Sequence, residues 1–593
     1  MPGQEFAVTE ARPDHADARV RSTSRFPRPA VGRLIAWQVL LLCVVISLAE
    51  HDGVRWVATA TASLIFLLTL VRVRFRWLYQ WVPTIVRFLH GRRSGGLGRL
   101  LAGLTFATTS EGRGTPAVGV VHDGAAWMSM VAVESVDVLG TDPASLPLGR
   151  ITELLDFDGS GPVTVQVLVR MIPGARQVSS PLTRRAWIVL RVEPATRRTS
   201  AFARGNTVTE VHKILSRGAQ RAAELLDSAG VRCRMLDEDG IREAMAWCGP
   251  EPSGSGIAWA EHWSAVRGAA EHTTYWLRCW PDGGLGVLMT VLGALPVSYV
   301  TVSLTATARQ GSAASLTVLV RTTCQPGGPA RGVVERAALS GGAQLMCLHG
   351  EQSAGVLATL PLGRGGVAGR LRSPVPSTVS LAPAGLPVGS LSDGTAVLAQ
   401  LLRAKPTHVG LFGSAYVAKL LALRAVTAGV PVHVITSRAG QWAPLMEAVN
   451  RDAPRMNLYP PGDPGPAANG SGSPLLVVDD TDDVAGPGLR RNIGAWQAVI
   501  VVRAQVGAES ARLLTSYDAV ILQRVTDGTD AALASILPEA AMRWMPRIPP
   551  EIVAVYTSGE TSFVNLSVTQ QESSLLGAPR LEDTEPADHA VTS

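Results

Sequence analysis

Two segments near the C-terminal end of the sequence carry residue types that could bind a nucleotide. The first, GLFGSAYVAK at 410–419, follows an apolar run and ends in a lysine. A phosphate-binding P-loop has the pattern GxxxxGK followed by Ser or Thr, in which backbone amides, the ammonium and the hydroxyl hold phosphate and Mg²⁺. Here Lys419 comes six residues after Gly413, and Leu420 stands where the hydroxyl should be. The dinucleotide pattern GxGxxG is also absent, so we interpret the segment as a structural turn.

The second segment is a cluster of aspartates after the apolar run LLVVDD at 475–480. Its members are Asp479, Asp480, Asp482 and Asp483. Carboxylates at the end of a strand can hold a divalent cation, as they do in sugar-nucleotide transferases and Walker B strands. Neither a matching base nor a phosphate loop accompanies them. We expect a solvated loop, and the alternative that stays open is a membrane-anchored glycosyltransferase-like or nucleotide-binding enzyme that uses the C-terminal α/β domain.

Histidines and cysteines form no recognisable catalytic or metal-binding pattern. The pairs Glu261/His262 and Glu271/His272 lack the HExxH spacing that places two imidazoles on one helical face. The six cysteines contain no CxxC pair, and no GxSxG nucleophile elbow occurs. We therefore predict a protein that is not an enzyme, with no catalytic residue, no metal and no cofactor.

Composition narrows the class of protein further. The chain has 593 residues, of which 46% are hydrophobic and 17% charged, so it is too apolar for a disordered chain and long enough for two or three domains. The formal charge of +6 rests on 54 basic residues, all arginines except Lys213, Lys405 and Lys419. Because these arginines are dispersed, we predict no nucleic-acid partner.

Two uncharged runs near the N-terminus predict a membrane anchor. They extend from Leu34 to Ala49 and from Trp56 to Val71, and only a short polar turn separates them. Each is slightly shorter than the roughly 20 residues that cross a bilayer, and flanking residues could extend the helices. We expect a two-helix transmembrane hairpin in a multi-pass protein of the cell (inner) membrane, with the lipid bilayer as a partner.

Arginines beside the two runs predict the orientation of this hairpin. Several precede the first run and follow the second, whereas the turn between them holds only Arg55. The positive-inside rule then places both termini and the bulk of the chain in the cytoplasm. The following stretch, RVRFRWLYQW from Arg72, alternates arginines with aromatic residues, which is typical of a segment at the lipid headgroups.

The rest of the sequence favours α/β domains. The turn HDG at 122–124 predicts a tight hairpin between two strands, which makes His122 a turn residue. Residues 207–228 have helical spacing. From Thr407 onward, strands alternate with helices, as in a doubly wound parallel sheet.

The fold class that we predict is therefore α/β, with an N-terminal two-helix transmembrane hairpin, cytoplasmic mixed α/β domains and a doubly wound, Rossmann-like C-terminal domain. The predicted parts, in order, are a disordered cytoplasmic tail at 1–30, the transmembrane hairpin at 31–72, an interfacial amphipathic segment at 73–93, a cytoplasmic α/β region at 94–362, a Gly/Pro-rich linker at 363–390, the Rossmann-like domain at 391–545 and a polar tail at 546–593.

Together these parts resemble the EccE family, a membrane component of the type VII (ESX) secretion system of actinobacteria. The likeness rests on the predicted hairpin, the stretch VRVRFRWLYQW after it, AVGVVHDGAAW at 117–127, and the segment from His408 to Trp442. No single motif is diagnostic; the order of the parts carries the resemblance.

The resemblance implies a non-catalytic structural subunit that stabilises the inner-membrane core complex of a type VII protein secretion system. Its implied partners are the other core subunits, EccB, EccC and EccD-like proteins, with EccC as the ATPase. We expect six residues to position the chain against membrane or partner: Trp37, Trp56, Arg72, Arg74, Trp77 and Trp81.

Overall fold

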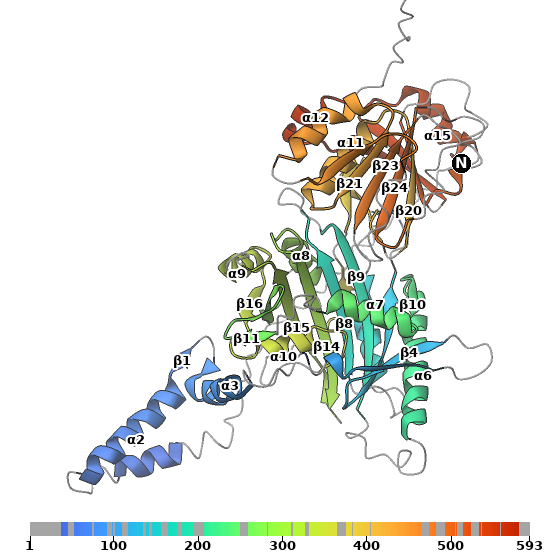
Figure 1. Ribbon diagram of the computed structural model, residues 1–593. Coiled ribbons are helices and arrows are strands. Elements are labelled where there is room, and N and C mark those ends of the chain that lie inside the picture. The colour runs from blue at the N-terminus through green and yellow to red at the C-terminus, as the bar shows by residue number, and fades with distance from the viewer. Residues whose placement is uncertain are drawn as a thin grey trace, which may run out of the picture. The chain divides into compact units, whose positions relative to one another are not determined.

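The computed structural model describes residues 37–579 (Figure 1) apart from gaps at 46–52, 74–75, 92–97, 99–100, 110–116, 135–137, 141–144, 156–163, 175–180, 194–206, 250–258, 282, 310–311, 327–330, 365–374, 382–383, 404, 452–453, 464–473, 482–492, 505, 507–513, 524–532, 535–536 and 558. The chain forms two compact units, Met1–His90 and Gly91–Ser593.

The N-terminal unit is mainly helical in its described part. Residues 37–45 are helical, and then come α2 (Gly53–Leu70), the ribbon of β1 (Arg72–Val73) and β2 (Arg76–Trp77), and α3 (Leu78–Gly91). The two short strands pair antiparallel, with Arg72 opposite Trp77. Pro83 lies inside α3.

The predicted two-helix transmembrane hairpin is wrong. None of the helices in the described ranges is long and apolar enough to cross a membrane. The 18 residues of α2 extend about 27 Å at 1.5 Å per residue, which is less than the roughly 30 Å of a hydrocarbon core. The middle of α2, ATATAS, also alternates Ala with Thr and Ser. The prediction counted the absence of charge and gave too little weight to these two features.

The second unit contains a twelve-stranded sheet whose pairings are all antiparallel. Its strands are β3 (Thr105–Thr109), β4 (Val118–His122), β5 (Trp127–Val133), β8 (Thr164–Ile172), β9 (Thr183–Val192), β10 (Cys233–Met235), β11 (Ala260–His262), β12 (Ala265–Arg267), β13 (Glu271–Cys279), β14 (Tyr299–Arg309), β15 (Ser312–Cys324) and β16 (Gln344–Cys347). Its helices are α5 (Leu148–Thr152), α6 (Thr207–Asp227), α7 (Glu238–Cys248), α8 (Gly284–Gly293), α9 (Arg331–Ser340) and α10 (Gln352–Ala358).

This sheet is an internal repeat. Its order is β3-β4-β5-β9-β8 followed by β14-β15-β13-β12-β11, with β10 on β5 and β16 on β13. The second half therefore mirrors the first, and the halves join where β8 pairs with β14. In each half the four strands of a β-α-β-β-α-β unit follow one another along the chain, as in ferredoxin-like folds. The sequence analysis did not detect this repeat.

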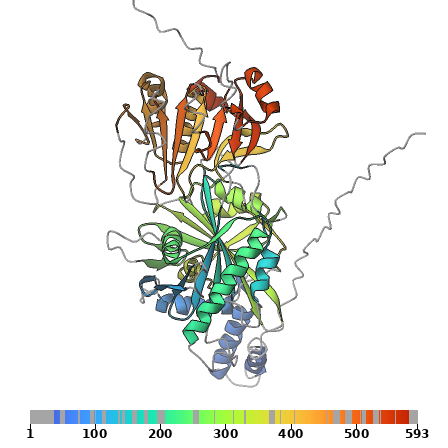
Figure 2. The same cartoon turned by 90° about the vertical axis from the view of Figure 1, so that its right-hand side faces the viewer.

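The packing of the helices follows the same repeat. Side chains from α5, α6, α8 and α9 share one hydrophobic core on one face of the sheet, and α6 crosses β4, β5 and β9 (Figure 2). On the opposite face α7 packs over the first half and α10 over the second. Alternate residues of β8 enter the two cores, because successive side chains of a strand point to opposite faces: Val167 joins the first core and Leu168 the second.

An eleven-stranded mixed sheet forms the rest of the second unit. Its order is β22-β21-β23-β24-β20-β25-β26-β27-β18-β19-β6. The strands are β6 (Leu139–Gly140), β18 (Leu386–Ser390), β19 (Ala396–Ala399), β20 (Thr407–Phe412), β21 (Val432–Thr436), β22 (Met456–Tyr459), β23 (Leu475–Asp480), β24 (Gln497–Arg503), β25 (Ala519–Leu522), β26 (Ile552–Thr557) and β27 (Glu560–Leu566). Its helices are α11 (Tyr416–Thr427), α12 (Ala439–Val449), α15 (Glu539–Trp544) and α16 (Gln570–Leu576), with a 3-10 turn η3 (Met545–Arg547).

The strands from β22 to β25 in this order are parallel, and those from β26 to β6 are antiparallel. The predicted parallel α/β character of this region is therefore confirmed. The order differs from the 3-2-1-4-5-6 order of dinucleotide-binding domains, since β23 and β24 lie between β21 and β20. Strand β18 lies in the segment predicted as linker, and β26, β27 and α16 lie in the one predicted as polar tail.

Two short pairings connect the sheets. β6, which leaves the first half of the repeat, pairs with β19 of the mixed sheet. β7 (Ser145–Leu146) pairs with β17 (Val379–Ser380). The chain thus passes from one sheet to the other and back.

Candidate functional site

The turn after β20 is closed by the side chain of Gln523, the residue that follows β25. Gly413 has φ +130°, and a Cβ on it would lie 2.6 Å from the Cβ of Gln523, so only glycine fits without a shift. The Gln523 side-chain oxygen accepts a hydrogen bond from the Ser414 amide at 2.5 Å. The Lys419 ammonium lies 5.7 Å from the ring centroid of Trp442, within cation–π range. These contacts agree with the predicted structural turn.

Asp480, at the end of β23, is fully buried and held by the chain itself. Its carboxylate accepts hydrogen bonds from the Thr436 hydroxyl at 2.9 Å and from Trp442 Nε1 at 2.8 Å. Arg438, at the start of α12, donates to the other oxygen and forms an ion pair with it. Both oxygens therefore have strong donors from neighbouring elements.

The neighbouring Asp479 is 1% exposed. Its Oδ1 accepts the Thr481 hydroxyl at 2.7 Å and lies 3.8 Å from Nη1 of Arg503. Its buried Oδ2 has no hydrogen-bond partner within the described ranges. The expectation of a solvated loop is therefore wrong for Asp479 and Asp480; Asp482 and Asp483 lie outside the described residues.

A second group of polar side chains lies on the twelve-stranded sheet, beneath α7. Strand pairing places Arg185 of β9 opposite Arg170 of β8, Arg170 opposite Thr301 of β14, and Thr301 opposite Arg321 of β15. Directly paired residues point to the same face, so these three arginines form one row across the junction of the repeats. We call Arg185, Arg170 and Arg321 the arginine row.

Aromatic rings contact two of these guanidinium groups. Arg170 lies 4.0 Å from the Tyr299 ring centroid and 5.5 Å from that of Trp247. Arg185 lies 4.8 Å from Trp247 and 4.0 Å from Trp496, and the two indoles stack at 4.5 Å. Since α7 carries Trp247 and the chain before β24 carries Trp496, the cluster joins the two sheets.

Arg321 is the most buried member of the row. It is 0% exposed and donates through Nη2 to the carbonyl of Cys248, at the C-terminal end of α7, where the helix dipole is negative. Its Nε and Nη1 have no partner in the part of the chain that the structure describes. Burial, and then the charge of Arg170, lower the pKa of Arg321 to about 9. Burial and both arginines lower the pKa of His272 to about 3, so this imidazole is neutral.

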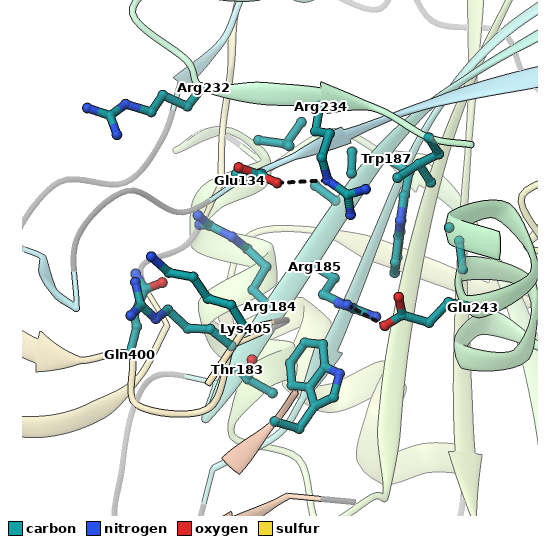
Figure 3. Close-up of a pocket in the computed structure, with 18 of the residues that line it drawn as sticks. Glu134, Thr183, Arg184, Arg185, Trp187, Arg232, Arg234, Glu243, Gln400 and Lys405 are labelled. Atoms are coloured by element: carbon teal, nitrogen blue, oxygen red, sulfur yellow. Dashed lines mark hydrogen bonds and ion pairs between the residues drawn. The ribbon is translucent and has the colours of Figure 1, made fainter. Parts of the chain in front are cut away.

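Next to Arg185 the second unit contains a cavity of about 300 Å³ (Figure 3). Six basic side chains line it: Arg184, Arg185, Arg232, Arg234, Arg403 and Lys405. Its two acidic residues are already paired, Glu243 with Arg185 at 2.9 Å and Glu134 with Arg234 at 3.1 Å. Asp518, which is not in the lining, lies 3.0 Å from Arg403 and 3.4 Å from Lys405. The lining of the cavity, as far as the structure describes it, therefore holds six basic side chains and two acidic ones.

The six residues predicted to position the chain are not gathered into one site. Trp37 and Trp56 are 48% and 76% exposed in separate helical segments, and Trp81 in α3 is 9% exposed. The backbone pairs Arg72 with Trp77, and Arg74 lies outside the described residues. Their role in positioning stays a prediction.

The arginine row and the cavity were not predicted from the sequence. The members of the row come from strands far apart in the sequence, and only the register brings them together. A weak signal exists in the strand TRRAWIVLRV, where Arg184 and Arg185 come directly before the apolar run AWIVL. Arginines at the start of a buried strand need a local reason.

With this geometry established, comparison with known proteins identifies part of the chain. Residues 180–277 match the model of a family described as "Putative type VII ESX secretion system translocon, EccE". The resemblance to EccE is confirmed over this segment. The EccE segment runs from β9 into β13 and so contains Arg185, α7 and three further basic residues of the cavity. No curated protein matches the sequence.

Solved structures give only distant likenesses. VirB4 of Thermoanaerobacter pseudethanolicus is 10% identical, covers 32% of this chain and 98% of its own, and has a TM-score of 0.24. EccC of Thermomonospora curvata (ATPases 2 and 3, with a signal sequence peptide) is 13% identical, covers 39% and 52%, and has a TM-score of 0.22. The pCW3 conjugation coupling protein TcpA with ATPγS is 10% identical, covers 52% and 87%, and has a TM-score of 0.21. At these TM-scores the likenesses carry no argument about this chain.

Proposed function

We propose that this protein is a non-catalytic structural subunit of a type VII protein secretion system. The match of residues 180–277 to EccE supports a component of that system. The observation that carries the non-catalytic part is the burial of Asp479 and Asp480 against Arg503, Arg438 and Trp442. A divalent cation would have to displace these donors before the Asp480 carboxylate could bind it.

The proposed role is to stabilise a membrane-associated secretion complex through contacts with the other core subunits, namely EccB, EccC and EccD-like proteins. A large folded body with extensive buried cores supports such a role, because it offers a rigid surface to several partners. A nucleotide-binding enzyme of the P-loop type would need a phosphate loop, and the turn after β20 instead has Gln523 bonded to the amide of Ser414.

Secretion by a strain that carries a single substitution tests this proposal. Lys419→Ala removes the ammonium group nearest the turn, and Lys213→Ala, on α6, is the matched control. If the subunit is structural, both variants should restore secretion to the wild-type level in a strain that lacks the gene, and the gene deletion alone should reduce recovery of the core complex.

A turnover assay tests the alternative that the protein is an enzyme. The purified chain with Mg²⁺ and ATP, GTP or nucleotide sugars should release product at the rate of the buffer blank. Turnover that Asp479→Asn abolishes, or secretion lost with Lys419→Ala at unchanged protein abundance, would refute the non-catalytic proposal. Binding without turnover does not bear on it.

A further inference from the structure

The cavity next to Arg185 has the charge of an anion-binding site. Its basic side chains come from β9, from β10 with the residue before it, and from the segment at 400–405, so they converge from three separate parts of the chain. Figure 3 shows Arg184, Gln400 and Lys405 on one side of the cavity and Arg185 and Arg234 on another, with Arg232 at the rim. An anion between these groups would be approached from several directions.

Trp496 supplies an independent observation. This residue lines the cavity, is 1% exposed, and its buried Nε1 has no acceptor among the residues described. Its backbone has φ +69°, the left-handed region, which costs a bulky residue roughly 1 to 3 kcal/mol. A buried donor without an acceptor is also destabilising. An anionic ligand in the cavity would supply the acceptor that this indole lacks.

We propose that the cavity binds a small anion that carries phosphate groups. A phosphate group has three acceptor oxygens and a charge of about −1.5 to −2, which suits several guanidinium groups at once better than a single carboxylate does. The volume of about 300 Å³ holds a small molecule. Trp187 and Trp496 are both nearly fully buried, so neither presents a ring face to a nucleotide base, and recognition is of the charged groups.

Two features of the lining agree with this ligand. Burial lowers the pKa of the Arg184 guanidinium to about 10, which still leaves it positively charged at neutral pH and able to bind an anion. The side chain of Lys405 also lines the cavity, and it is 63% exposed with its ammonium 3.4 Å from Asp518. The phosphate groups could belong to a soluble molecule or to a lipid headgroup, and this inference stands apart from the proposed role in secretion.

Calorimetric titration of the full chain with inorganic pyrophosphate tests the proposal. The total ionic strength is held constant during the titration, because exposed charges are screened by salt. Pyrophosphate should bind with measurable heat and raise the melting temperature, whereas equimolar chloride should do neither. Vesicles of phosphatidylglycerol, compared with phosphatidylcholine vesicles, form a second arm; binding to these that pyrophosphate competes away would identify a lipid headgroup as the source.

Substitutions in the lining of the cavity test whether pyrophosphate binds there. Lys405→Ala and Arg184→Gln should each weaken pyrophosphate binding about tenfold, the effect of losing one charge-assisted hydrogen bond. Trp496→Phe keeps the ring and removes the donor, so it should weaken binding without a comparable fall in melting temperature. Lys213→Ala, an exposed lysine on α6, is the matched control and should leave the affinity unchanged.

Three results would overturn the proposal. One is the absence of binding to both pyrophosphate and the anionic vesicles. Another is binding that Lys405→Ala, Arg184→Gln and Trp496→Phe leave unaltered while each variant remains folded. The third is binding of a peptide rich in Asp and Glu where pyrophosphate gives no heat, which would make the cavity a docking site for a partner protein.

Discussion

At the scale of single residues, two buried arginines of the described structure, Arg191 and Arg321, differ in their counter-charges. Arg191 of β9 is buried and has a counter-charge: it donates to Asp123 at 2.8 Å and to Glu193 at 2.9 Å. Arg364 approaches the same Asp123 at 2.9 Å. Arg321, equally buried, has no carboxylate bonded to it in the described structure. We therefore expect Arg191 to stabilise the fold and Arg321 to destabilise it.

The contribution of the Asp123 carboxylate to the free energy of unfolding should depend on pH. Burial alone would raise its pKa, but the hydrogen bond and charge of Arg191 and the amides of Ala125 and Ala126 lower it from 3.8 to about 2. Because the pKa is lower in the folded state, the carboxylate stabilises the fold fully above pH 3.8, and this stability is lost as the pH falls toward 2. Asp123→Asn should cost about 2 to 3 kcal/mol at pH 7.

Urea unfolding at pH 7 and pH 3 measures this contribution. The difference in free energy of unfolding between the wild-type protein and Asp123→Asn should shrink by about half at pH 3, since the unfolded wild-type chain is then largely protonated at this position. A difference that is equal at both pH values would show that the loss comes from packing and not from the charge.

Arg321→Met should have little cost or raise stability. It removes a buried cation that lacks a counter-charge and lies beside Arg170, and methionine fills a similar volume. Arg191→Met is the matched control, because it leaves Asp123 buried with one fewer partner and should cost about 3 kcal/mol. Thermal unfolding compares the two; an equal loss in both variants would indicate that Arg321 has a counter-charge in solution.

At the scale of elements, local patterns in the sequence predicted the turns and helices that depend on residues close together in the chain. The Asp-Gly turn between β4 and β5 has Gly124 at φ +86°, with the Asp123 side chain bonded to the amides of Ala125 and Ala126, so the HDG prediction is confirmed. The helix predicted at 207–228 is α6. Both signals depend on residues that are neighbours in the sequence.

The register between strands that are distant in the sequence determines which residues become neighbours, and local patterns do not contain it. Arg170 and Arg321 belong to one row of the sheet only because β14 lies between β8 and β15 in this register, and nothing near either residue specifies that order. The repeat was missed for the same reason, since its halves share strand order and helix placement while the sequence shows no detectable period. The hairpin prediction was wrong because uncharged length was treated as equivalent to a long apolar helix.

At the scale of the whole molecule, the eleven-stranded sheet depends on residues from the ends of the second unit. The edge strand β6 comes from residues 139–140, and β26 and β27 come from residues beyond 550. Arg424 of α11, nearly fully buried, donates to both carboxylate oxygens of Glu572 on α16, at 2.6 and 2.8 Å. Glu572 also accepts from the Thr569 amide in a capping box. The C-terminal segment is thus an integral part of this sheet.

Truncation of the chain tests whether residues after 545 are a polar tail or part of the sheet. A chain that ends at 579 keeps β26, β27 and α16 and should melt like the full-length protein. A chain that ends at 545 exposes the edge of β25, where Val520 and Tyr556 are paired, and leaves the Arg424 guanidinium without its carboxylate. Unpaired strand edges promote aggregation, and removal of one partner of a buried ion pair costs about 3 to 5 kcal/mol. The shorter chain should therefore elute as aggregate in size-exclusion chromatography. In the full chain, Glu572→Gln should lower the melting temperature by several degrees. A soluble, cooperatively melting chain 1–545 would instead establish that the sheet is complete without these strands.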